Sequence, residues 1–160
     1  MHSSLSDASR RNLHRASLII IEDNPDERVI IRRAAEQTLE DISLIWANTA
    51  DDALRYLDQC DGQVRLLPKL VLLDLYLPDA EQGWQFLTQL KDRSWKRSLP
   101  IVVLSRSSSP ADVIQAYDLG ANSYIIKPGS LEAWHDYFSS LRLYWWETVT
   151  LPVVSPAPTL

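Results

Sequence analysis

The chain has 160 residues, a formal net charge of -5 at pH 7 and one cysteine, Cys60. This length fits a single domain with one hydrophobic core, and the acidic balance argues against a nucleic-acid-binding surface, which needs clustered positive charge. One cysteine excludes an intrachain disulfide and a multi-thiolate metal site. No apolar stretch reaches the roughly 18 to 20 residues of a membrane span, and residues 1–16 lack the apolar segment of a secretory signal. We therefore expect a cytoplasmic protein that contacts neither membrane nor nucleic acid.

The first strand is predicted to end in a pair of acidic residues. Residues 1–16 are polar and aperiodic, which predicts a disordered N-terminal tail. The apolar run Leu18–Ile21 then predicts a buried strand, and Glu22 and Asp23 follow it directly. Residues 24–39 have the pattern of a helix that starts with an Asn-Pro pair, which is typical of a helix cap and first turn.

A third acidic residue ends a later strand. Residues 43–47 predict a second strand, and residues 49–57 predict a helix from the spacing of their apolar side chains. The run Leu70–Leu73 predicts a third strand, and Asp74 follows it. Residues 75–83 form a turn-rich loop before the next helical pattern.

A hydroxyl and an ammonium group follow the last two predicted strands. Residues 101–104 predict the fourth strand, which ends at Ser105. A helix over residues 109–120 ends at a glycine, and the fifth strand, residues 124–126, is followed by Lys127. The last helix is predicted to bury one apolar stripe: Leu131, Trp134, Phe138, Leu141 and Trp145.

Strands and helices therefore alternate along the chain. Short apolar runs separated by helical patterns are typical of strands buried on both faces of a parallel sheet with crossover helices, so the fold class is predicted to be α/β. The carboxyl ends of such strands share one edge, where ligand sites form. We expect the acidic pair, Asp74, Ser105 and Lys127 to meet there.

Taken together, these motifs make residues 17–146 resemble a response-regulator receiver domain. The resemblance is carried by Ile21–Asn24, Leu73–Pro78, Leu104–Ser105 and Tyr124–Pro128. It implies a flavodoxin-like, doubly wound five-stranded parallel sheet of order 2-1-3-4-5 with helices on both faces. It also implies a single-domain response regulator of a two-component or phosphorelay system.

The resemblance assigns the central chemistry to Asp74. This carboxylate would accept a phosphoryl group from a histidine kinase and form an aspartyl phosphate. Glu22, Asp23 and Asp74, with the backbone carbonyl of Tyr76, would hold Mg²⁺. Such a protein is a phosphoacceptor switch rather than an enzyme, because it catalyses only its own phosphorylation and dephosphorylation.

Three further residues receive roles from the same resemblance. Ser105 and Lys127 would contact phosphoryl oxygens and favour the phosphorylated state. Tyr124 would be the switch aromatic that reorients with Ser105 and changes the surface of the fourth helix, fifth strand and fifth helix. The family also has a cis peptide after the lysine, here at Lys127-Pro128. The chain departs from the family at Arg106, where a small residue is common, and a large cation there could shield the acyl phosphate from water.

The C-terminal extension, residues 147–160, is too short for an output domain, so signalling is expected through a downstream or phosphotransfer protein. The apolar segment 144–154 resembles the extension of stand-alone receivers that accompany phytochrome-type histidine kinases. Its helix end either folds back on its own core or forms a homodimer or kinase-docking patch on Trp145, Trp146 and Val149.

Two other functions would also use parts of this pattern. A phosphohydrolase of the haloacid-dehalogenase type also uses an aspartate after an apolar strand, but it needs an acid two residues later, where this chain has Tyr76. A receiver-like interaction module would work without phosphorylation. Mutation of Asp74 to Asn would separate a module from a switch.

Overall fold

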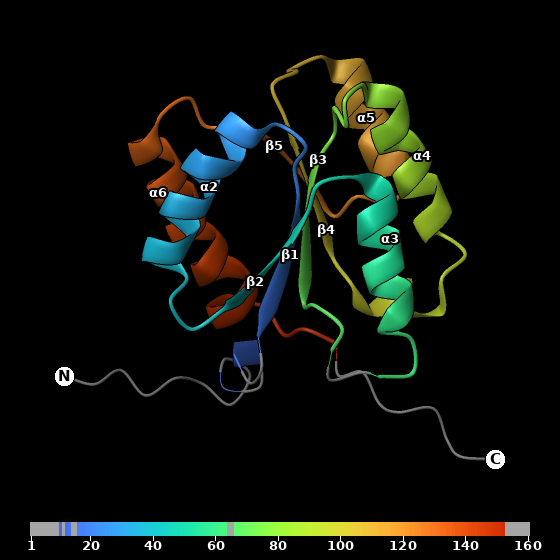
Figure 1. Ribbon diagram of the computed structural model, residues 1–160, viewed down its shortest axis with the longest axis horizontal. Coiled ribbons are helices and arrows are strands. Elements are labelled where there is room, and N and C mark those ends of the chain that lie inside the picture. Colours follow the sequence, from blue (N-terminus) through green and yellow to red (C-terminus); the bar gives the residue numbers. More distant parts are fainter. Residues whose placement is uncertain (1–9, 11, 14–15, 64–65, 153–160) are drawn as a thin grey trace.

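A computed structural model describes residues 10, 12, 13, 16–63 and 66–152 of the chain. Its centre is one sheet of five parallel strands in the order β2-β1-β3-β4-β5 (Figure 1). The strands are β1 (Ser17–Ile21), β2 (Ser43–Ala47), β3 (Leu70–Asp74), β4 (Ile101–Ser105) and β5 (Ser123–Ile126). The predicted α/β class and the strand order implied by the resemblance are both confirmed.

Helices cover both faces of this sheet. They are α2 (Pro25–Thr38), α3 (Ala50–Gln59), α4 (Ala80–Leu90), α5 (Pro110–Asp118) and α6 (Leu131–Arg142), with a short 3₁₀ helix η1 (Ser94–Ser98) and a π-helical turn η2 (Leu143–Thr148). In Figure 1, α2 and α6 lie together on one side of the sheet, and α3, α4 and α5 lie on the other. No helix in the described part of the chain has the length and apolar character to span a membrane.

The interiors of the strands are apolar because each strand contributes to two cores. In β1, Ile19 and Ile21 pack with α3 and α4, whereas Leu18 and Ile20 pack with α2 and α6. Successive side chains of a strand point to opposite faces, so a strand covered on both sides reads as a continuous hydrophobic run.

Side-chain caps set where the helices start. Asn24 Oδ1 accepts hydrogen bonds from the backbone nitrogens of Asp26 at 2.9 Å and Glu27 at 3.2 Å. Ser130 Oγ accepts one from Ala133 N at 3.1 Å, which starts α6. These caps satisfy backbone donors of the first helical turn. Because the Asn24 cap follows the acidic pair, α2 begins beside the C-terminal edge of the sheet.

The predicted stripe of the last helix packs against the core, with Leu131 and Trp145 at its partly buried margin and Trp146 as an added member. Trp134, Phe138 and Leu141 are buried as expected, but Trp146 is 0% exposed while Trp145 is only half-buried. The chain passes from α6 into η2, where Val149 N bonds to the carbonyl oxygen of Tyr144, five residues earlier. This wider turn adds a residue, so the inward-facing position moves forward by one.

The segment before β1 contacts the segment after α6. The Nδ2 of Asn12 donates to the carbonyl oxygens of Val149 at 2.6 Å and Trp146 at 3.3 Å, and its Oδ1 accepts from Leu151 N at 3.3 Å. Asn12 is buried, which differs from the loose tail expected at this residue. Residues 1–9, 11, 14–15 and 153–160 of the two expected tails lie outside the described residues.

Candidate functional site

Three carboxylates meet at the C-terminal edge of the sheet. Glu22 and Asp23 follow β1, and Asp74 is the last residue of β3, which is the neighbour of β1. One carboxylate oxygen of each residue lies within 4.8 Å of the others. Glu22 and Asp74 are buried and Asp23 is half-buried. An oxygen-rich, negatively charged cluster of this size suits a hard divalent cation.

Lys127 lies directly against this cluster. Its Nζ donates to Glu22 Oε2 at 2.8 Å, lies 3.3 Å from Asp74 Oδ2, and also bonds to Glu27 Oε2. The lysine follows β5, and its backbone nitrogen bonds to the carbonyl oxygen of Ser105 at 2.8 Å. The side chain is only 5% exposed, so the ammonium group is inside the site.

The cis peptide implied by the resemblance is not at Lys127-Pro128. In the described part of the chain the cis peptide bond is Leu77-Pro78, in the loop after β3. The isomer of Lys127-Pro128, which the sequence left open, is therefore not the cis form suggested by the resemblance. The ion pairs of Lys127 direct its side chain inward with a trans bond at this position.

Glu27 belongs to the site and was missed in the sequence. Its Oε1 accepts from Arg106 Nε at 3.0 Å and from Arg106 Nη2, while its Oε2 contacts Lys127. One available signal was its position in the first turn of a helix that starts beside the acidic pair. Arg106 is 73% exposed, so this guanidinium lies at the solvent side of the site.

Ser105 and Tyr124 meet at the loop after β4. Ser105 is fully buried, and its Oγ accepts from the backbone nitrogen of Ser107 at 3.1 Å. The hydroxyl of Tyr124 donates to the carbonyl oxygen of Ser107 at 2.7 Å. Asp112, which the sequence did not single out, accepts from Ser107 Oγ at 2.6 Å and from the hydroxyl of Tyr76 at 3.4 Å. The predicted hydroxyl and switch residues are therefore connected through one loop residue.

Burial makes the negative charge in this cluster costly. Desolvation raises the pKa of Glu22 to about 8, and the neighbouring charge of Asp74 adds to the effect. Desolvation also raises the pKa of Asp74. Burial alone would raise the pKa of Glu27, but hydrogen bonds from Lys127 and Arg106 lower it overall. A cation bound between the carboxylates of Glu22 and Asp74 would offset this cost.

The residues of the site line an open cavity of about 740 Å³. Its lining includes the three carboxylates of the cluster with Lys127, Glu27 and Arg106. Close approach of α4 shapes the neighbouring loop, because a Cβ on Gly83 would lie 2.1 Å from the carbonyl oxygen of Leu75.

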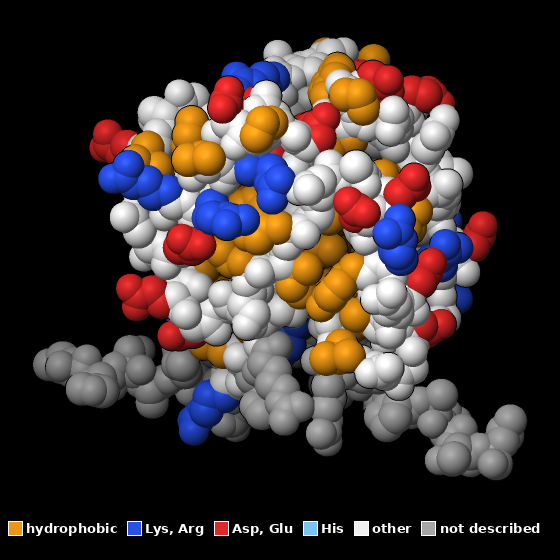
Figure 2. All heavy atoms as spheres, viewed as in Figure 1, with side chains coloured by type: hydrophobic (Ala, Val, Ile, Leu, Met, Phe, Trp, Pro, Cys, Tyr) orange, Lys and Arg blue, Asp and Glu red, His pale blue; other side chains and the backbone are white. Residues whose placement is uncertain are grey.

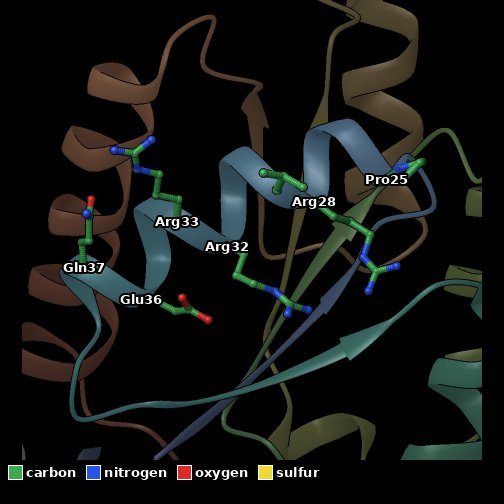
Figure 3. Close-up of a pocket in the computed structure, with 7 residues that line it drawn as sticks. Pro25, Arg28, Arg32, Arg33, Glu36 and Gln37 are labelled. Atoms are coloured by element: carbon green, nitrogen blue, oxygen red, sulfur yellow. The ribbon is translucent and has the colours of Figure 1, made fainter.

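A second cavity, of about 350 Å³, lies along α2 (Figure 3). Figure 3 shows Arg28, Arg32 and Glu36 extending from one side of the helix toward β2, while Arg33 and Gln37 extend from the other. It lacks a carboxylate cluster. On the face shown in Figure 2, acidic and basic side chains are interspersed with hydrophobic ones, so charge of both signs is distributed over it.

Comparisons with known proteins place this geometry in a family. The family described as "Response regulator receiver domain" matches residues 18–138, which include every site residue described above. The chain is 37% identical over 128 residues to the probable methanogenesis regulatory protein FilR2 of Methanothrix harundinacea, covering 80% of this chain and 82% of that protein. It is 30% identical over 137 residues to response regulator Rcp1 of Synechocystis, covering 84% and 92%.

Solved structures show the same relationship. The phosphorylated cyanobacterial phytochrome response regulator RcpA has a TM-score of 0.74 and 28% identity, with 86% of this chain and 99% of that chain covered. The Mn²⁺-bound form of response regulator Rcp1 has a TM-score of 0.72 and 29% identity, with 86% and 99% covered.

Proposed function

Because the chain belongs to the response regulator receiver domain family, whose role is phosphorylation-dependent signalling in two-component systems, we propose that Asp74 accepts a phosphoryl group from a histidine kinase. One observation carries this proposal. The carboxylates of Glu22, Asp23 and Asp74 lie within 4.8 Å of one another, and the ammonium group of Lys127 lies 3.3 Å from Asp74. This set combines a nucleophile, a candidate cation site and a fixed positive charge.

The proposed reaction is a phosphoryl transfer between proteins. A carboxylate oxygen of Asp74 forms a bond to phosphorus while the bond between phosphorus and the kinase histidine nitrogen breaks. The backbone nitrogen of Tyr76 donates to Asp74 Oδ1 at 3.2 Å, which orients the carboxylate. Lys127 neutralises charge on the transferred group.

Receiver domains bind Mg²⁺ or Mn²⁺ at an acidic pocket, and this chain has such a cluster. We assign Mg²⁺ binding to the carboxylates of Glu22, Asp23 and Asp74 and the backbone carbonyl of Tyr76. The bound ion would supply positive charge that offsets repulsion between these carboxylates and the phosphoryl group. The donor set fits, because its charged ligands are all oxygens and burial raises the pKa of two of them, Glu22 and Asp74, so a cation would stabilise their ionised forms.

The switch is proposed to run through Ser105 and Tyr124. In the present structure Ser105 Oγ accepts a hydrogen bond from Ser107, and the proposed new role is to donate to a phosphoryl oxygen. The Tyr124 hydroxyl donates to the carbonyl oxygen of Ser107, so movement of this loop would also move the acceptor of Tyr124. The surface of α5, β5 and α6 would then differ between the two states.

The proposed partner is a sensor histidine kinase in the cytoplasm. A phytochrome-type kinase is favoured by the likeness to RcpA, which is described as a phytochrome response regulator. A downstream protein or a phosphotransfer partner would receive the signal. A homodimer through the C-terminal helix would use the exposed Leu143 and Tyr144, because Trp146 is buried in its own core and is unavailable for docking.

The test is phosphorylation of the purified protein. It is incubated with Mg²⁺ and acetyl phosphate, then with a panel of autophosphorylated histidine kinases, and intact mass is measured for wild type and Asp74→Asn. Addition of one phosphoryl group to wild type alone would support the proposal. Absence of addition from every donor would contradict it and favour a receiver-like module that acts without phosphorylation.

A further inference from the structure

The Lys127 ammonium group donates hydrogen bonds to two carboxylates and forms an ion pair with a third. Its nitrogen faces Glu22 Oε2 at 2.8 Å, Asp74 Oδ2 at 3.3 Å, and Glu27 Oε2. An ammonium group has three N–H donors and no more. A phosphoryl oxygen that binds Lys127 therefore competes with these carboxylates for its donors.

Glu27 is the partner best placed to leave. Glu22 and Asp74 are buried at the strand ends and belong to the carboxylate cluster, whereas Glu27 lies outside that cluster and its side chain is 17% exposed. Moving it into water restores its hydration, and its position on the first turn of α2 is already at the cavity edge. The same movement would break its bond to Arg106.

We propose that Glu27 is a gating residue: it occupies the place on Lys127 that a phosphoryl oxygen needs, and its displacement transfers both Lys127 and Arg106 to the phosphoryl group. Arg106 thereby becomes a second phosphate-binding cation. This inference rests on the proposed phosphorylation of Asp74. It adds that Glu27 competes with the phosphoryl group for Lys127, and that Arg106 is released to bind the phosphoryl group.

The position and chemistry of Arg106 support this role. It follows Ser105 directly in the chain and lines the same cavity as Asp74 and Lys127. Its side chain is 73% exposed, so it can move without breaking core packing. A guanidinium group also matches two phosphate oxygens better than it matches the single carboxylate oxygen, Glu27 Oε1, that it contacts now.

The simpler interpretation is that Glu27 and Arg106 form an ordinary surface ion pair. Exposed pairs of this kind contribute little free energy. That interpretation gives Glu27 no influence on phosphoryl binding and gives Arg106 none either. The two interpretations therefore predict different effects of Glu27 and Arg106 substitutions on the affinity for a phosphoryl analogue.

The first experiment measures binding of beryllofluoride in the presence of Mg²⁺ by ¹⁹F NMR titration of the full chain. Glu27→Gln should bind more tightly than wild type, on the order of tenfold, which is the scale of one charge-assisted hydrogen bond that no longer has to break. Asp26→Asn is the matched control, because Asp26 is the adjacent acid in the same helical turn and does not line the cavity. The control should bind like wild type. Damage to the fold would weaken binding, so tighter binding is a result that a merely structural role cannot produce.

The second experiment tests Arg106. Arg106→Gln should bind beryllofluoride on the order of tenfold more weakly than wild type, and the loss should persist when it is combined with Glu27→Gln. Arg55→Gln removes an exposed arginine that pairs with Asp52 on α3, far from the site in sequence, and should have no effect. A weaker affinity in the double variant than in Glu27→Gln alone identifies Arg106 as a ligand of the analogue.

The outcomes separate this inference from the proposed function. Binding by wild type that is lost in Asp74→Asn supports phosphorylation at Asp74 by itself. If Glu27→Gln and Arg106→Gln both bind like wild type, the gate is overturned while the proposed function stands. If neither wild type nor Glu27→Gln binds the analogue, both are overturned.

Discussion

The side-chain nitrogen of Asn12 lies 2.6 Å from the carbonyl oxygen of Val149, which joins the segment before β1 to the segment after α6. This contact is at the end of the sheet where β1 begins, opposite the carboxylate cluster. Asn12 is buried and also bonds to the backbone of Leu151, so its amide supplies hydrogen-bond partners to backbone groups that are shielded from water.

Replacement of Asn12 by Ala should therefore lower the free energy of unfolding by about 1 to 3 kcal/mol, because buried backbone groups lose their partners. Urea denaturation measures the change. The exposed Asn48→Ala is the control and should be nearly neutral. Phosphorylation of Asn12→Ala under native conditions should match wild type, and a marked loss of phosphorylation would contradict a purely structural role.

Gly83 should be intolerant of a side chain. An added Cβ would lie 2.1 Å from the carbonyl oxygen of Leu75, so Gly83→Ala must push α4 away from the loop that follows Asp74. We expect a loss of about 1 to 3 kcal/mol in the free energy of unfolding, the usual range for overpacking. Gly129→Ala is the matched control, because no heavy atom lies within 4 Å of its added Cβ. Equal stability of the two variants would show that α4 can move freely.

The π-helical turn predicts different roles for two adjacent tryptophans. Trp146→Ala should lower the free energy of unfolding by about 3 to 5 kcal/mol, because a fully buried aromatic side chain is lost. Trp145→Ala should cost clearly less, since that side chain is half-buried. Chemical denaturation of both variants measures the difference. The reverse order would mean that the helix continues in α-helical register through this segment.

The metal-free protein should lose stability as the pH rises. Burial raises the pKa of Glu22 from 4.5 to about 8 and also raises the pKa of Asp74. Between pH 4.5 and about pH 8, Glu22 is ionised in the unfolded chain but keeps its proton in the folded chain. The free energy of unfolding therefore falls as the pH rises and levels off above about pH 8. The lowered pKa of Glu27 acts in a lower pH range and does not oppose this trend.

Denaturation at several pH values in EDTA measures this slope. Glu22→Gln should show a smaller slope, because it lacks the main titrating group. Added Mg²⁺ should flatten the slope, since the bound ion favours the ionised carboxylates and the folded chain then keeps no extra proton. A slope that is the same in wild type and Glu22→Gln would contradict the assignment.

Local sequence was enough to predict the main site because a parallel sheet brings strand ends together. Glu22, Asp74 and Ser105 each follow or end a short apolar run, and the sheet places these ends along one edge. The order of elements, the caps at Asn24 and Ser130, and the α/β class likewise depend on residues close in the chain.

Tertiary packing decided the rest. Glu27 enters the site because the first turn of α2 lies against the end of β5. Glu27 and Lys127 are 100 positions apart in the chain, so no local sequence pattern indicates their contact. Trp146 is buried more deeply than Trp145 because a π-helical turn shifts the register. Asn12 is buried because the segment before β1 contacts the segment after α6. Periodicity and caps record interactions over a few residues, so they determined the elements and the edge where the site forms, whereas contacts between distant segments determined which side chains complete it.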